Sequence, residues 1–127
     1  FLDNKKRYEE YKKEYHLLIQ SFLEILKPQD ASLELLEVKN CTFRINRDIR
    51  FSKDKTPFKT FWGGSYTRAT SARRGGYYFH LEKGNTFFAG GFWGPNAADL
   101  KRIRSEFAHD PGSFREILNS KTFKNTF

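Results

Sequence analysis

The chain has 127 residues, 30% of them charged and 38% hydrophobic, and its 23 Lys and Arg against 15 Asp and Glu give a net charge of +8. Its apolar runs are all shorter than the roughly 20 residues that span a bilayer, so no transmembrane helix and no membrane partner are expected. A single cysteine, Cys41, excludes an internal disulfide and is typical of a cytoplasmic protein. We expect one domain over residues 1–127, with a core built mainly from aromatic rings, which make up 17% of residues.

Residues 3–26 are predicted to form one long amphipathic helix that ends before Pro28. Large apolar side chains recur there at steps of three and four, which places on one face Tyr8, Tyr11, Tyr15, Leu18, Phe22 and Ile25. We interpret this stripe as core packing, and a ligand-facing wall of tyrosines is the alternative. Residues 29–40 form a link with a short strand or helical turn.

The first strand is predicted over residues 41–45, where Cys41, Phe43 and Ile45 face one way. Residues 47–57 are rich in turn formers and indicate an ordered loop. A second strand follows over residues 60–68, in which Gly63-Gly64 indicates a bulge or a close backbone approach. Residues 67–76 are small and polar, which is typical of an exposed loop.

Residues 76–93 are the clearest hairpin. One face of its first strand carries Tyr77, Phe79 and Leu81, and the other carries Tyr78, His80 and Glu82. Lys83-Gly84-Asn85 supplies the turn and residues 86–92 return. Asn96 is a predicted N-cap for a helix over residues 97–107, a shorter helix covers 112–118, and residues 119–127 show no clear structure.

This order predicts an α+β fold. An antiparallel sheet would carry the long N-terminal helix on one face, with two shorter C-terminal helices following.

The positive charge is concentrated between Lys39 and Arg74. This block holds ten basic residues and two acidic ones, Asp48 and Asp54, so its net charge equals that of the whole chain. Such a concentration is costly to hold together unless a partner offsets it, which indicates an anionic partner.

The centre of this block, FRINRDIRFSKDKTPFK from Phe43 to Lys59, resembles the signature of the domain-of-unknown-function family 2461. The start, Asn4-Lys5-x-x-Tyr8, resembles the first helix of that family. Two further runs resemble its hairpin, Gly76-Tyr77-Tyr78-Phe79-His80-Leu81 and Gly90-Gly91-Phe92-Trp93-x-Pro95. The similarity covers nearly the whole chain and implies a soluble, mostly bacterial protein with no established activity or ligand. Family members extend further at both ends, so we expect a trimmed copy of a longer domain, and Phe58 stands where tyrosine is common.

Arginine clusters bind phosphate or carboxylate through paired donors, and they also brace loops by bonding to carbonyls and acids. We predict binding of a nucleotide, a nucleic-acid backbone or a phosphorylated metabolite, through the basic side chains Arg44, Arg47, Arg50, Lys53, Lys55, Lys59 and Arg68. Interleaved aromatic rings would allow base stacking if they are exposed. Bracing is the alternative, with Asp48 pairing with Arg47 or Arg50 and Asp54 accepting backbone donors at a turn.

An enzyme acting on an anionic substrate is a second hypothesis, in which His80 or Asp48 moves a proton. The sequence has no paired Cys or His motif for zinc and no phosphate-loop pattern, so no metal and no cofactor are predicted. The ligand and the oligomeric state are left open at this stage.

Overall fold

The computed structural model describes residues 4–68 and 74–127. Residues 69–73, which are half of the predicted exposed loop and include Arg73, lie outside the described residues. The chain divides into two compact units, Phe1–Phe92 and Trp93–Phe127. The fold class is α+β, as predicted, with an antiparallel three-stranded sheet and the longest helix at the N-terminus.

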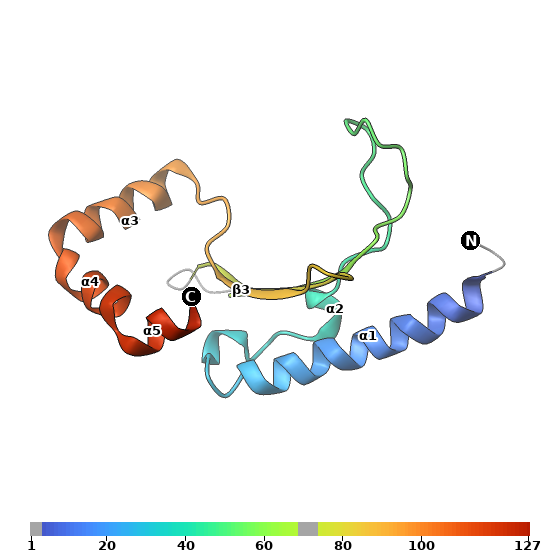
Figure 1. The fold of residues 1–127 in the computed structure, drawn as a ribbon, viewed down its shortest axis with the longest axis horizontal. Helices are drawn as coiled ribbons and strands as arrows, with labels where there is room; N and C mark the ends of the chain where they lie inside the picture. Colours follow the sequence, from blue (N-terminus) through green and yellow to red (C-terminus); the bar gives the residue numbers. More distant parts are fainter. Residues whose placement is uncertain (1–3, 69–73) are drawn as a thin grey trace. The chain divides into compact units, whose positions relative to one another are not determined.

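The first unit contains the helix α1 (Lys5–Leu26) and the sheet (Figure 1). Two short helical turns follow α1, η2 (Ala31–Leu33) and α2 (Val38–Cys41). The strands β1 (Trp62–Thr67), β2 (Gly76–Leu81) and β3 (Phe87–Gly91) are ordered β1-β2-β3 and pair antiparallel. The β2–β3 hairpin therefore forms as predicted, with Gly84 at positive φ in its turn.

The buried line of α1 differs from the predicted stripe. Tyr15, Ile19 and Leu23 are buried, whereas Tyr11 and Ile25 are 46% and 58% exposed. The second half of this helix carries apolar residues at adjacent positions, 17–19, 22–23 and 25–26, so periodicity alone fits two neighbouring stripes. Contact with the sheet selects the stripe centred on Ile19, and it is joined there by Phe22, whose ring packs on Phe79 at 4.9 Å.

Gly63 and Gly64 mark a close backbone approach, one of the two alternatives predicted for them. The β1–β2 register is continuous through both residues, so β1 has no bulge between them. A Cβ atom on Gly64 would lie within 2.3 Å of Cδ1 of Ile19, so the absence of a side chain lets α1 pack directly on β1.

The strand predicted over residues 41–45 is wrong. Cys41 ends the helical turn α2, which begins with a capping box between Glu37 and Asn40. The chain that follows makes two isolated bridges, Thr42 with Gly64 and Asn46 with Phe58. The alternation of apolar residues was misleading here because Cys41 reaches the core from a helical turn and not from a strand.

The second unit consists of three helices, α3 (Ala97–His109), α4 (Pro111–Asn119) and α5 (Lys121–Thr126). Asn96 caps α3 as predicted, accepting the Asp99 N–H at 2.9 Å. The expectation of an unstructured tail and of two C-terminal helices is corrected by α5, which is capped by the Ser120 hydroxyl. The sequence did not reveal α5 because a Ser cap is a signal of one residue, and six residues are too few to show helical periodicity.

A buried carboxylate connects η2 to the sheet. Asp30 is 3% exposed and accepts hydrogen bonds from Ser32, from Nε of Arg68 at 2.7 Å and from the Tyr77 hydroxyl at 3.1 Å. Hydrogen bonds from the Ser32 hydroxyl, followed by those from Arg68, hold the pKa of Asp30 well below its usual range.

We expect Gly64→Ala to destabilise the first unit by about 1–3 kcal/mol, because the added methyl group overlaps the fully buried Ile19. Urea denaturation measures the loss. Adding Ile19→Val, which removes Cδ1, should recover part of it, and the control Gly90→Ala, whose Cβ would meet Tyr77 only at 3.5 Å, should have a smaller effect. Equal losses in the two alanine variants would contradict the close packing.

We expect Asp30→Asn to flatten the acid side of the stability profile. A carboxyl whose pKa is lowered by folding stabilises the protein above its unfolded value of about 3.9, and this contribution disappears as the pH falls through the lower folded value. The free energy of unfolding of the wild type should therefore fall more steeply below about pH 4 than that of the variant. The exposed Glu9→Gln serves as the control, and identical profiles for Asp30→Asn and wild type would refute the assignment.

Candidate functional site

The central part of the basic block forms a long arm, defined here as residues 42–61, that leaves α2 and returns to β1 (Figure 1). Backbone hydrogen bonds hold the two sides of its base together, Arg47 N–H to the Pro57 carbonyl and Lys59 N–H to the Ile45 carbonyl, both at 2.9 Å. The predicted loop over residues 47–57 is therefore ordered by its own backbone pairing.

Asp54 braces the arm, as the sequence predicted. Its carboxylate accepts the backbone N–H of Thr56 at 2.9 Å and the Thr56 hydroxyl at 2.6 Å, and it also binds Nη1 of Arg47. These hydrogen bonds, led by the Thr56 hydroxyl, hold the pKa of Asp54 well below its usual range. Arg47 donates a further hydrogen bond to the Thr56 carbonyl at 3.3 Å.

Two more basic side chains are engaged within the arm. Arg50 donates two side-chain hydrogen bonds to Asp48, from Nε to Oδ1 at 2.9 Å and from Nη2 to Oδ2 at 2.6 Å. The Arg50 guanidinium is the main cause of the lowered pKa of Asp48, so this carboxyl remains ionised and paired. Lys55 donates to the Ile49 carbonyl at 2.9 Å.

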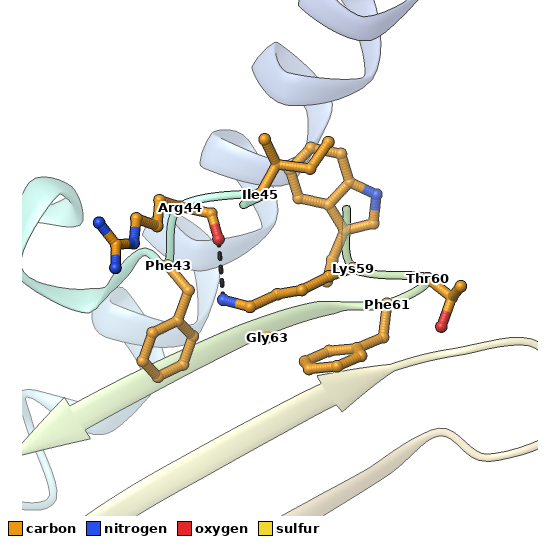
Figure 2. Close-up of a pocket in the computed structure, with 8 residues that line it drawn as sticks. Phe43, Arg44, Ile45, Lys59, Thr60, Phe61 and Gly63 are labelled. Carbon is orange, nitrogen blue, oxygen red and sulfur yellow. Dashed lines mark hydrogen bonds between the residues drawn. The ribbon is translucent and has the colours of Figure 1, made fainter. Parts of the chain in front are cut away.

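Lys59 occupies a different position, at the base of the arm over the sheet. Its ammonium group donates to the Arg44 carbonyl at 2.8 Å and lies 5.3 Å from the Phe43 ring centroid and 6.0 Å from that of Phe61 (Figure 2). Desolvation, and secondly the charge of Arg44, lower the pKa of Lys59. The Arg44 guanidinium itself extends away from Phe61 (Figure 2).

The predicted ligand-binding set is thus not gathered at one point. Arg68 lies at the end of β1 and binds Asp30, while Arg47, Arg50 and Lys55 are tied to groups of the arm. Within residues 4–68 and 74–127, the side chains of Arg44 and Lys53 make no hydrogen bond. The ligand-binding role of the whole set stays a prediction.

The face of the sheet opposite α1 carries a chain of polar side chains, Tyr78 and His80 of β2 and Glu82 directly after it. The Tyr78 hydroxyl lies 2.9 Å from Nδ1 of His80, and Nε2 of His80 lies 3.2 Å from Oε2 of Glu82. Glu82 also accepts from Asn85 at 3.1 Å and from Thr60 at 3.3 Å. Strand alternation places Tyr78 and His80 on one face of β2, because alternate residues of a strand point the same way. Glu82, the residue directly after β2, continues this spacing.

His80 is held firmly in this chain. It is 8% exposed, and its ring is stacked between those of Phe61, at 4.4 Å, and Phe87, at 5.0 Å. Tyr78 in turn lies beside Phe43, with ring centroids 6.4 Å apart. The Phe43 ring therefore lies beside both Lys59 and Tyr78, and the Phe61 ring lies beside both Lys59 and His80.

Two cavities adjoin this arrangement. The smaller, of about 120 Å³ and here termed the Lys59 cavity, is lined by Phe43, Arg44, Ile45, Lys59, Thr60, Phe61, Trp62 and Gly63. The larger, of about 370 Å³, is lined by His80, Glu82 and Asn85 of the hairpin and by seven arm residues, Arg47, Asp54, Thr56, Phe58, Lys59, Thr60 and Phe61. Lys59, Thr60 and Phe61 belong to both.

Of the two predicted acid–base candidates, the structure brings His80 to a cavity and pairs Asp48 with Arg50 in the arm. The sequence reasoning did not name Glu82, Asn85 or Thr60 as site residues. The period-two pattern Tyr78-x-His80-x-Glu82 was the available signal for Glu82, whereas Thr60 comes from a separate segment and had none.

No group of three or more His, Cys, Asp or Glu side chains capable of holding a metal ion occurs in the described parts of the chain. The thiol of Cys41 is buried, and burial raises its pKa to about 11, which leaves it protonated. Among the described residues, no helix is both long enough and apolar enough to cross a membrane.

Comparison with known proteins identifies a family. A family model described as "Conserved hypothetical protein (DUF2461)" matches residues 1–127, the whole chain. Searches of curated proteins and of solved structures found no match.

We expect Asp54→Ala to loosen the arm without unfolding the sheet, because Asp54 contacts the arm residues Arg47 and Thr56. Chymotrypsin cleavage at Phe51, which is 95% exposed, should become several-fold faster while the thermal midpoint changes little. Asp110→Ala, which removes an equivalent cap in the second unit, should leave the cleavage rate at Phe51 unaltered. The same cleavage rate in Asp54→Ala and wild type would show that Asp54 does not order the arm.

Proposed function

We propose that this chain, which belongs to the DUF2461 family, binds a small phosphate-bearing anion in the Lys59 cavity. The description of the family carries no activity, so the proposal rests on the site. Its main support is the environment of the Lys59 ammonium group.

The Lys59 cavity has two basic side chains in its lining and no acidic one. The pKa of Lys59 is lowered by desolvation and by Arg44, so its positive charge is poorly compensated in the absence of a ligand. A bound anion would stabilise that charge. This is the single observation that most favours anion binding over bracing as the role of Lys59.

The geometry also leaves donors for a ligand. An ammonium group has three N–H donors, and Lys59 uses one on the Arg44 carbonyl. The adjoining walls are the rings of Phe43 and Phe61, which would exclude water and strengthen a charge-assisted hydrogen bond to a phosphate oxygen.

The remaining basic residues of the arm have a supporting role in this proposal. Arg47 and Arg50 are paired with acids, which reduces what each can offer to a ligand. Arg44 and Lys53 add positive potential near the cavity and at the arm tip. Such a positive potential raises the association rate of an anion, and this effect weakens as the salt concentration rises.

A nucleic-acid backbone is the second candidate ligand, favoured by the arm tip. Phe51 is 95% exposed, and the Arg50 guanidinium lies 5.8 Å from its ring centroid. An exposed ring flanked by cations is able to stack on a base while the cations meet phosphates. In that case Phe51→Ala would weaken binding of a single-stranded oligonucleotide, and the affinity would fall steeply with salt.

For the small-anion proposal, we expect Lys59→Gln to weaken binding of inorganic phosphate roughly 10–100-fold, the usual range for losing a hydrogen bond to a charged group. Isothermal titration calorimetry at low salt measures the affinity. Lys53→Gln, which removes the same charge at the arm tip, is the matched control and should lower affinity less than threefold or so. Equal losses in the two variants would mean that only net charge matters and would refute the Lys59 cavity as the site.

A further inference from the structure

In the polar chain formed by Tyr78, His80 and Glu82, the donor and the acceptor of each hydrogen bond can be assigned. Hydrogen bonds from Asn85 and, secondly, from His80 lower the pKa of Glu82, so this carboxylate is ionised and can only accept. Nε2 of His80 must therefore carry a proton toward Glu82. In the neutral ring Nδ1 then accepts the hydroxyl proton of Tyr78, whose pKa is raised by desolvation so that the phenol keeps its proton at neutral pH.

The side chain of Tyr78 lies beside Gly63 and Phe43, two of the residues that line the Lys59 cavity. A Cβ on Gly63, one of the lining residues, would be 3.1 Å from this oxygen and 3.5 Å from the Phe43 ring. Gly63 therefore leaves a gap between the phenol and the cavity. Because both nitrogens of His80 are engaged within the chain, Tyr78 is the member placed to connect the imidazole with an occupant of that cavity.

We propose that Tyr78, His80 and Glu82 form an acid–base relay that exchanges a proton with the phosphate-bearing anion bound at Lys59. This inference rests on the proposed function, since it requires the anion to occupy the Lys59 cavity. The ligand would be a phosphate or phosphate monoester that carries one acidic P–OH group.

The proton balance of the step is simple. The P–OH proton passes to the Tyr78 oxygen while the phenol passes its own proton to Nδ1 of His80, so Tyr78 ends as it began. The ligand becomes a dianion, held by the positive charge of Lys59, and His80 becomes an imidazolium paired with Glu82 at 3.2 Å. The reverse step returns the proton to the bound ligand.

The charged groups around His80 are compatible with this exchange. Glu82, directly after β2, places a negative charge beside Nε2 of His80, and Lys59 and Arg47 line the same cavity from the arm with positive charges. Asp54, also in that lining, is already paired with Arg47. The β3 side contributes the uncharged ring of Phe87. A dianion beside Lys59 neutralises the opposing charge, and so couples anion binding to protonation of His80.

The experiment measures protons taken up when inorganic phosphate binds the full chain, by calorimetry in two buffers of different ionisation enthalpy. At about pH 8 inorganic phosphate is mainly the dianion, since its second pKa lies below this pH. The wild type should then take up a proton from the buffer on binding. His80→Gln should abolish this uptake while phosphate still binds, more weakly than to the wild type because the imidazolium charge is lost.

Two further variants test the relay as a unit. Tyr78→Phe would leave the imidazolium Nδ1–H buried without its acceptor, and Glu82→Gln would remove its counter-charge, so both should reduce the uptake. His109→Gln, in the second unit, is the matched control and should leave it unaltered. Circular dichroism confirms that each variant is folded.

The outcomes separate the two proposals. Phosphate binding to the wild type without proton uptake, or uptake that persists in His80→Gln, overturns the relay and leaves the Lys59 site standing. Failure of phosphate to bind overturns the proposed function, and the relay with it.

Discussion

The hydroxyl of Tyr15 joins the three parts of the first unit on which the site depends. It donates to the Gly63 carbonyl of β1 and accepts the backbone N–H of Phe43 at 3.3 Å, so helix, sheet and arm meet at one oxygen. Desolvation raises the pKa of Tyr15, which keeps the donor in place. The contact sets the base of the arm against the sheet, and the Lys59 cavity lies where the two meet.

The neighbouring glycines serve the two faces of the sheet separately. Successive residues of a strand point to opposite faces, so Gly64 faces α1 and Gly63 faces the arm. The first allows Ile19 to reach the strand, and the second leaves room for the Tyr78 hydroxyl beside Phe43. One Gly-Gly step therefore supports both the core and the candidate site.

Charge is distributed less simply than its total indicates. Asp48 and Asp54, the two acids of the block, are each used to hold an arginine and a turn, so much of the basic arm is internally paired. Lys59 differs from these arginines, because it is half-buried and its ammonium group meets a carbonyl and two aromatic rings but no acid. Partial burial without an acidic partner, and not charge density, therefore marks the residue that would gain most from an anionic ligand.

The long helix, the β2–β3 hairpin and the Asn96 cap followed from the sequence by itself, because periodicity, turn chemistry and capping act over a few residues. Tertiary structure alone decided that α1 turns Ile19 inward, that residues 41–45 do not form a strand, and that Lys59 differs from Arg47. Those outcomes depend on contacts between distant segments, such as Tyr15 with Gly63, 48 residues apart, and Lys59 with the Arg44 carbonyl. A local sequence pattern does not identify such a partner, because the partner comes near only when the chain has folded.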